Sequence, residues 1–327
     1  MIITLIPAYK PAFIEELLLA LASQTFKNFK VIISDDSPNA EITKLLHSGK
    51  CDRYTKNLDV KVIEGPRKGG YTNCFHLVRN FAKLSEFFHL YFDDDIIYPT
   101  FYENHLNAHT RKNSMVSVSV RWNANEKGQP INLTMDNATN FAFLNDFSAK
   151  NIASQLIPIG INKLGEYSNA IYRKEAAEKI LYPNIDNISY FGVDDLGSFI
   201  NATIEKEGIW IPIPLSAFRM HANQNTNNTK NTSIKCSHFA WIAHSIISLR
   251  RGWIDEAQAW ACISKIKNKL NNRLANDIHG SAVLSLLNEY DSLNSKTISN
   301  FLGFWNAYLT EVKLKEISDG DLTIQLL

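Results

Sequence analysis

Short apolar runs and helically spaced apolar residues follow one another along the first hundred positions. Four β-branched or aromatic runs predict strands at residues 2–6, 31–33, 60–63 and 88–92. Helices are predicted between them at residues 13–21 and 71–85. Because strands alternate with helices, this part of the chain predicts an α/β fold, with a mostly parallel sheet flanked by helices on both faces.

The second half continues this alternation less regularly, and after residue 222 it contains a polar stretch followed by helix-length segments only. Further strands are predicted at residues 115–120, 165–172 and 209–213, with helices from about residue 174 and at 196–207. The polar stretch NQNTNNTKNT cannot bury a core, and four helix-length segments follow it, at 236–251, 253–270, 274–290 and 296–312. The expected organisation is an α/β domain at 1–222, an Asn-rich linker or loop at 223–234 and a helical C-terminal domain at 235–327.

The composition narrows the class of protein. Of the 327 residues, 45% are hydrophobic and 20% are charged, as in ordinary globular proteins. The formal net charge of +1 provides no overall field for nucleic acid, which is therefore not an expected partner. Four separated cysteines form no CxxC pair, so neither a disulfide framework nor a zinc knuckle is indicated. Because signal-peptide features are lacking and no apolar stretch reaches the ~20 residues of a membrane-spanning helix, we expect a cytoplasmic protein, at most peripheral to the membrane.

Acidic residues follow two of the predicted strands. Asp35 and Asp36 come after the second strand, and Asp93, Asp94 and Asp95 come after the fourth. Ligands of open α/β sheets bind at the carboxyl ends of the strands, so both acidic groups are expected in one cleft. Mg²⁺ and Mn²⁺ prefer oxygen ligands and bind one or two carboxylates together with substrate phosphates. The triplet therefore predicts a metal and diphosphate site, the alternative being a solvated turn that caps a helix.

A second acidic pair and a histidine lie farther along the chain. Asp194 and Asp195 precede a predicted helix, and a carboxylate there could take the proton of an attacking hydroxyl group. The alternative is that both residues only favour the helix N-terminus through its dipole. His221 follows the strand at 209–213 and is a candidate for binding a metal or a phosphate, the alternative being a structural histidine.

The glycines near the third strand do not form a known phosphate loop. Lys68, Gly69 and Gly70 lack the spacing of a Walker or GxGxxG motif, which argues against a dinucleotide site. Arg67, Lys68 and Arg79 are candidates for contacting a nucleotide or its phosphates, with plain surface solvation as the alternative.

Taken together, these motifs resemble the family 2 glycosyltransferases of the GT-A fold. The match lies in LIPAY at 5–9, LASQT at 21–25 and FKVIISDDS at 29–37, and it extends over about residues 1–222. Asp93, Asp94 and Asp95 resemble the DXD motif of that family, and Asp194 and Asp195 resemble its acidic pair, which is more usually Glu-Asp. The helices after residue 234 resemble nothing in the family.

The resemblance implies roles for particular residues. It implies contacts with the donor nucleotide from Pro7, Tyr9, Asp35, Asp36, Lys68, Gly70, Arg79, Asp93 and Asp94. It implies Asp95 as the direct metal ligand, assisted by Asp93 and His221, with Mn²⁺ or Mg²⁺ as the cofactor. It implies Asp195 as the general base, with Asp194 as the first member of the catalytic pair.

The expected function is therefore inverting transfer of a hexosyl or N-acetylhexosaminyl group from a nucleotide sugar, with UDP as the expected nucleotide. The expected acceptor is a glycan or a lipid-linked, surface-polysaccharide type of molecule. The C-terminal helices are candidates for binding the acceptor, for forming homo-oligomers, or for touching the inner face of the membrane. Two alternatives remain open: a non-catalytic module that binds sugar nucleotides or glycans, and a nucleotidyltransferase.

Overall fold

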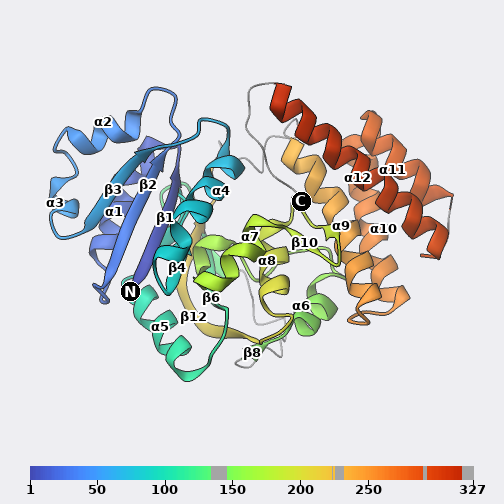
Figure 1. Ribbon diagram of the computed structural model, residues 1–327, viewed down its shortest axis with the longest axis horizontal. Helices are drawn as coiled ribbons and strands as arrows, with labels where there is room; N and C mark the ends of the chain where they lie inside the picture. The colour runs from blue at the N-terminus through green and yellow to red at the C-terminus, as the bar shows by residue number, and fades with distance from the viewer. Residues whose placement is uncertain (134–145, 223, 225–231, 290–292, 319–327) are drawn as a thin grey trace. The chain divides into compact units, whose positions relative to one another are not determined.

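The computed structural model describes residues 1–133, 146–222, 224, 232–289 and 293–318 (Figure 1). The chain divides into two compact units, each assembled from separate segments. The first unit contains Met1–Phe147, Leu164–Leu181 and Glu205–His221, and the second contains Ser148–Lys163, Tyr182–Ile204 and Ala222–Leu327. Most of the expected linker at 223–234 lies outside the described residues. The second unit includes two segments that precede that stretch as well as the C-terminal helices.

The first unit is built on a mixed sheet. Within the described residues it has ten strands, eight of them in the order β3-β2-β1-β4-β9-β6-β12-β5. The first four are β1 (Ile2–Ala8), β2 (Phe29–Asp35), β3 (Asp59–Glu64) and β4 (Phe87–Leu90), and they pair in parallel. The register sets Ala8 beside Asp35 and Asp35 beside Glu64. The carboxyl ends of three strands therefore meet at one edge, as the sequence predicts.

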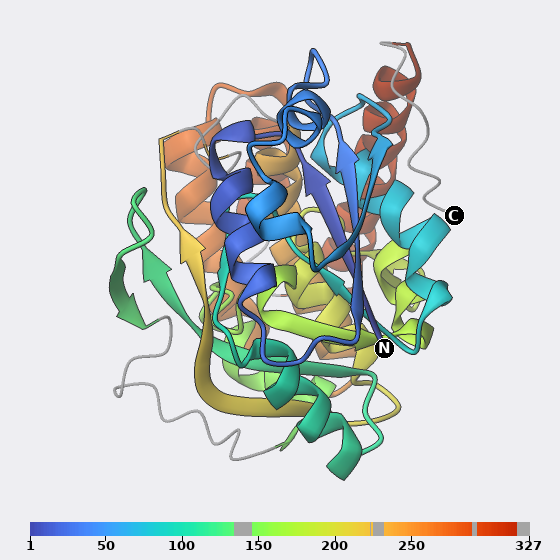
Figure 2. The same cartoon turned by 90° about the vertical axis from the view of Figure 1, so that its left-hand side faces the viewer.

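The other half of the sheet adds antiparallel pairs. Its strands are β5 (Ile96–Ile97), β6 (Val116–Ala124), β7 (Pro130–Leu133), β8 (Asp146–Phe147), β9 (Ala170–Arg173) and β12 (Gly208–Arg219). Strand β12 is parallel to β6, and its register shifts twice, next to Pro214. Proline removes a ladder donor, and irregular pairing bends a strand. Figure 2 shows β12 as a long curved strand, and its last residue, Arg219, pairs with Ala124 at the end of β6.

Helices cover the parallel strands. They are α1 (Ile14–Ala22), α2 (Glu41–His47), α3 (Asp52–Thr55), α4 (Gly70–Phe81), α5 (Phe101–Arg111) and α7 (Ala177–Leu181). Single 3-10 turns lie at Pro11–Phe13, Ala82–Leu84, Tyr167–Asn169 and Lys174–Ala176. Helix α4 lies on the other side of β1–β3 from α2 and α3 (Figure 1). The expected α/β sheet with helices on both faces is confirmed.

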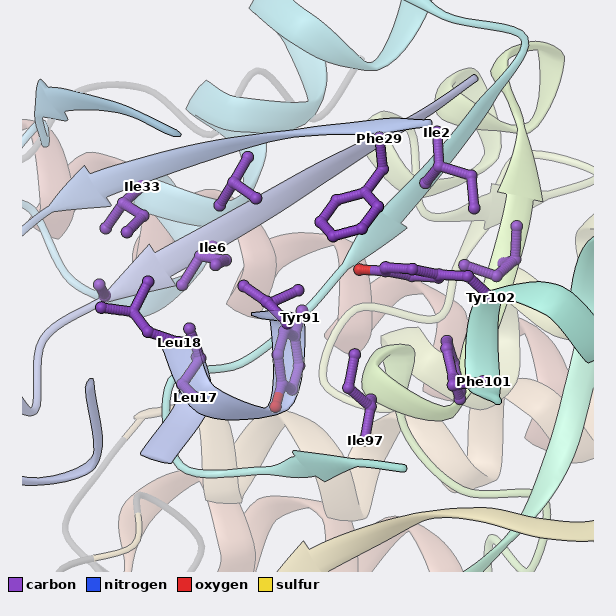
Figure 3. Packing of buried hydrophobic residues seen from close by; sticks show 14 of the residues in the cluster. Ile2, Ile6, Leu17, Leu18, Phe29, Ile33, Tyr91, Ile97, Phe101 and Tyr102 are labelled. Carbon is purple, nitrogen blue, oxygen red and sulfur yellow. The ribbon is translucent and has the colours of Figure 1, made fainter. Parts of the chain in front are cut away.

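The core of the first unit contains a buried polar chain as well as apolar side chains. Figure 3 shows Tyr91 and Tyr102 among the aliphatic side chains beneath β1 and β2. The Tyr102 hydroxyl lies 2.7 Å from the Thr4 hydroxyl and 3.2 Å from His89 Nδ1. His89 Nε2 lies 2.9 Å from the carbonyl oxygen of Ser168, so Nε2 must carry the proton and donate it. A neutral His89 then accepts from Tyr102, which links the core to the segment at 167–169.

The second unit is mostly helical. Its elements are α6 (Ala149–Leu156), β10 (Asn184–Ile185), β11 (Ile188–Ser189), α8 (Asp194–Ala202), α9 (Thr232–Arg250), α10 (Glu256–Leu274), α11 (Ile278–Asn288) and α12 (Ser295–Ser318). The buried indole of Trp305 donates to the carbonyl of Ser189 at 2.8 Å, which joins α12 to the β10–β11 hairpin. The four expected C-terminal helices are confirmed. No helix in the described part of the chain is long and apolar enough to cross a membrane.

One predicted strand is shorter than expected, and several elements are unpredicted. The strand expected at 165–172 starts only at Ala170, because residues 167–169 form a 3-10 turn. Helices α2 and α5 and strand β5 were not predicted. Helix α5 carries buried His105 and His109 where an amphipathic helix would carry aliphatic residues, which obscures its periodicity.

Four buried histidines make the stability of the fold depend on pH, and among them His105 has a pKa that burial lowers well below its usual value. Burial lowers the pKa of His89 to about 3 and the pKa values of His109 and His244 to about 4. The folded protein keeps these imidazoles neutral, whereas the unfolded chain binds protons below about pH 6.5. Stability is therefore complete above that pH and is lost as the pH falls, by about 1.4 kcal/mol per pH unit for each buried imidazole.

We expect the thermal unfolding midpoint to fall clearly between pH 7 and pH 5. The exposed His47 provides the control, because His47→Gln should leave the pH profile unchanged. A midpoint that stays constant over this range would show that the buried imidazoles are protonated in the folded state.

Candidate active site

The acidic loop, defined as Asp93, Asp94 and Asp95, follows β4 and is held against the end of β1. The backbone N–H groups of Tyr9 and Lys10 both donate to Asp93 Oδ2 at 2.6 Å. Asp93 is 3% exposed, and burial raises the pKa of its carboxyl group, although Lys10 opposes the shift. One oxygen of Asp93 is thus occupied in positioning residues 9 and 10.

Asp94 lies between a lysine and a histidine. Its Oδ2 atom is 2.5 Å from Lys10 Nζ and 2.9 Å from His221 Nε2. Burial alone would raise the pKa of Asp94, but Lys10 and His221 outweigh burial and lower it. The structure therefore brings the predicted His221 to the acidic loop, where its hydrogen-bond partner is Asp94.

Asp95 is the most strongly perturbed member of the loop. Burial raises the pKa of its carboxyl group well above the usual range, and the nearby carboxylates of Asp94 and Glu166 add to the shift. The backbone N–H of Arg219 donates to Asp95 Oδ1 at 3.4 Å, and the Ser168 hydroxyl also bonds this carboxyl group. A buried carboxyl group among like charges is stabilised by a nearby cation.

Sequence reasoning missed Arg219, which holds the backbone of the acidic loop through a hydrogen bond. Its guanidinium group is 2% exposed, donates to the carbonyl oxygens of Asp94 at 2.8 Å and Glu126 at 2.7 Å, and pairs with Glu16 at 2.7 Å. It also lies 4.7 Å from the ring centroid of Phe13. Arg219 stands two residues before His221, but an isolated arginine in a sequence gives no signal of such partners.

Asp35 and Asp36 differ in what their carboxylates bind. Asp35 accepts four hydrogen bonds, from the backbone and hydroxyl of Ser37 and from the backbone and hydroxyl of Thr43. Asp36 accepts from the backbone N–H of Arg67, in the loop after β3. The backbone N–H of Asp36 donates to the carbonyl oxygen of Ala8 at 2.8 Å. The Asp35–Asp36 pair therefore flanks the β1 turn, defined as residues 8–10, which Asp93 also bonds. The two acidic groups therefore lie beside one turn, and their sharing of one cleft stays a prediction.

The four bonds to Asp35 predict a structural cost on substitution. In Asp35→Asn the amide nitrogen faces donors that it cannot bond, so we expect a loss of about 2–3 kcal/mol in the free energy of unfolding. Chemical denaturation measures this loss. Asp59→Asn is the matched control, because Asp59 on β3 forms an exposed pair with Lys30 on β2. Equal stability of the two variants would contradict the assigned bonds.

The loop after β3 approaches Asp36 closely. A Cβ atom on Gly65 would lie 2.7 Å from Asp36 Oδ1 and 2.9 Å from the carbonyl oxygen of Asp35, so only glycine fits. Gly69 has a φ of 86° and precedes the first residue of α4, Gly70. Lys68 lies in this loop, whereas Arg79 is exposed in the last turn of α4. Arg79 therefore lies roughly 13 Å along the helix from Gly70.

Asn73 is a second residue that sequence reasoning missed. It is 1% exposed on α4, and its side-chain nitrogen donates to the carbonyl of Ser34 at 3.1 Å. No hydrogen-bond partner for its side-chain oxygen lies within the described residues. Asn73 thus joins α4 to β2 directly before the Asp35–Asp36 pair.

A pocket of about 450 Å³ lies next to these residues but not on the acidic loop. Its walls come from β2, β3, α2 and α3, and Asp35, Glu64 and Arg67 lie among its polar lining. None of Lys10, His221 or the acidic loop lines it. The pocket and the acidic loop are therefore separate features of the first unit.

Asp194 and Asp195 belong to the second unit and form the first turn of α8. The backbone N–H of Gly192 donates to Asp194 Oδ2 at 2.8 Å, and that of Leu196 donates to Asp195 Oδ1 at 2.7 Å. Asp194 is 5% exposed and Asp195 is more open to solvent. A Cβ atom on Gly192 would lie 2.6 Å from the backbone of α9, which fixes the turn that leads into the pair.

The sequence profile described as glycosyl transferase family 2 matches residues 4–181, more than half of the chain. The chain belongs to glycosyl transferase family 2. The matched region of this glycosyltransferase includes the acidic loop and the Asp35–Asp36 pair, whereas Asp194, Asp195 and His221 lie beyond it. The expected family and fold class are thereby confirmed.

Solved structures of low identity share the fold of this glycosyltransferase. One is S. aureus TarS 1–349 in complex with UDP-GlcNAc, with 16% identity and a TM-score of 0.53, covering 84% of this chain and 74% of that one. Another is the mannosyltransferase PcManGT from Pyrobaculum calidifontis in complex with GDP-Man and Mn²⁺, with 12% identity and a TM-score of 0.51, covering 95% and 86%. A search of curated protein sequences finds no match.

Proposed function

We propose that this glycosyltransferase moves a sugar from a nucleotide-sugar donor to a hydroxyl group, with inversion at the anomeric carbon. One observation carries the proposal: the carboxylates of the acidic loop lie largely withdrawn from water at the end of β1, beside Lys10 and His221. Sites that bind a diphosphate and a cation need this combination of acidic and basic groups.

Residues around the β1 turn are proposed to bind the donor nucleotide. Pro7, Tyr9 and Asp36 surround the turn, Lys68 lies in the loop that Asp36 bonds, and Gly70 begins α4 directly after that loop. Asp35 accepts four internal hydrogen bonds at the end of β2, and its expected contact with the nucleotide stays a prediction. The TarS complex makes a uridine nucleotide the first candidate and N-acetylhexosamine a candidate sugar, while the PcManGT complex makes guanosine and mannose the next ones.

The acidic loop fits a divalent cation that is held jointly with the donor. Asp95 is buried among like charges, so a cation would stabilise its carboxylate more than the other two. Asp94 and His221 supply an oxygen and a nitrogen ligand nearby. No group of three or more His, Cys, Asp or Glu side chains among the described residues is arranged to hold a metal alone. A bound cation would offset the charge of the leaving diphosphate, with the donor phosphates completing its coordination.

Asp195 is proposed to take the proton of the acceptor hydroxyl group. Its carboxylate accepts from the backbone N–H of Leu196 and is more exposed than that of Asp194, and a general base must reach the bound acceptor. The proposed acceptor is a glycan or a lipid-linked precursor of a surface polysaccharide. The C-terminal helices α9–α12 are proposed to bind it, with oligomerisation or contact with a membrane surface as the other roles to test.

A ligand screen tests the proposal. Thermal midpoints are measured with UDP-sugars and GDP-sugars, with and without Mn²⁺, together with release of free nucleotide. We expect one donor to raise the midpoint only with Mn²⁺ and to be hydrolysed slowly. Binding without release, even with candidate acceptors, would favour a non-catalytic sugar-nucleotide module.

A further inference from the structure

Lys10 brings a fixed positive charge into the acidic loop. Its ammonium group lies 2.5 Å from Asp94 Oδ2 and 3.5 Å from Asp93 Oδ1, and its side chain is 22% exposed. Burial alone would lower the pKa of Lys10, but the carboxylates of Asp93 and Asp94 outweigh burial and raise it. The ammonium form of Lys10 is therefore favoured here, and it contacts two of the three carboxylates.

The position of Lys10 is fixed at its backbone. Its N–H donates to Asp93 Oδ2, and the next residues form the 3-10 turn Pro11–Phe13. The ring of Phe13 packs against His221 with centroids 5.3 Å apart. The backbone of residue 10 is thus anchored, whereas the four-carbon stem of the lysine leaves its ammonium group free to reach a second anion on the solvent side.

We propose that the Lys10 ammonium group acts as an internal counter-cation, which competes with a divalent cation for Asp94 and binds the donor diphosphate when the cation displaces it. The proposal rests on the proposed function, because it assigns a role to one residue of the same donor site. Two cations cannot share Asp94 Oδ2 at contact distance without repulsion, so metal alone should bind weakly. A diphosphate draws Lys10 toward itself, so metal and nucleotide should strengthen each other's binding.

The test uses the full-length protein and the variant Lys10→Met, which keeps the length of the stem and the backbone N–H that Asp93 binds. The control is Lys30→Met, which removes one positive charge from an exposed pair with Asp59. Isothermal titration measures binding of Mn²⁺ alone, and then of UDP and of GDP at saturating Mn²⁺. Circular dichroism compares the folds, and Lys10→Gln replaces the methionine variant if the latter fails to fold.

Lys10→Met should bind Mn²⁺ alone on the order of tenfold more tightly than the wild type, and should bind the nucleoside diphosphate on the order of tenfold more weakly. A residue with a merely structural role would weaken both. Equal Mn²⁺ affinity of Lys10→Met and wild type, with intact UDP or GDP binding, would overturn the role of Lys10 and leave the proposed function standing. If none of the proteins bound Mn²⁺ or a nucleotide, the donor site and the role of Lys10 would both be rejected.

Discussion

Asp195→Asn is expected to lower kcat by roughly 10²–10⁴-fold while leaving the fold and the binding of donor unchanged, because general bases contribute about this much to proton transfer. The amide keeps the shape of the side chain and its oxygen can still accept from the N–H of Leu196. What it loses is the ability to take a proton from an acceptor hydroxyl group.

A structural role for Asp195 predicts a different result. As an acidic residue in the first turn of α8, it would contribute about 0.3–1 kcal/mol to stability through the helix dipole and nothing to turnover. Glu256→Gln is the matched control, since Glu256 lies in the first turn of α10 in the same unit and is exposed. Near-normal kcat in Asp195→Asn, with stability lowered as in the control, would rule out the base assignment.

Asp95→Asn is expected to abolish Mn²⁺-dependent binding of the donor, while the thermal midpoint of the protein without ligands stays equal or rises. Asp95 is 5% exposed, and burial together with Asp94 and Glu166 disfavours its ionised form. A neutral amide removes this buried charge, so function and stability should change in opposite directions.

Binding is measured by titrating the donor with and without Mn²⁺, and stability by the thermal midpoint at neutral pH. Asp59→Asn removes an exposed carboxylate from the same unit and should change neither. A variant that kept Mn²⁺-dependent binding would show that another residue holds the cation. A large drop in the midpoint would instead show that the Asp95 carboxylate mainly supports the fold.

The sequence predicts which carboxylates of the site follow neighbouring strands and therefore lie close together. Continuous apolar runs in β1, β2 and β4 mark buried parallel strands, and the rule that their carboxyl ends share an edge brings Asp36 and Asp93 to one turn. The register between these strands is set by burial of their side chains, which the apolar pattern encodes directly.

The basic residues that bond the acidic loop could not be predicted in the same way. Lys10 and Asp94 are 84 residues apart, and Arg219 and the carbonyl of Asp94 are 125 apart. Neither lysine nor arginine follows a period that reveals such a partner. Likewise, Asp35 and Asp36 are adjacent in the sequence, and only the positions of Thr43 and Arg67 reveal that Asp35 bonds α2 whereas Asp36 bonds the loop after β3.

Real-time ¹H NMR of the sugar released from the donor that the ligand screen selects tests the central claim most directly. With water as the acceptor and Mn²⁺ present, the account predicts that an α-linked nucleotide sugar first yields the β anomer, before mutarotation, and that Asp195→Asn releases it far more slowly. Initial release of the α anomer, or no consumption of any donor by the wild-type protein, would contradict inverting glycosyl transfer.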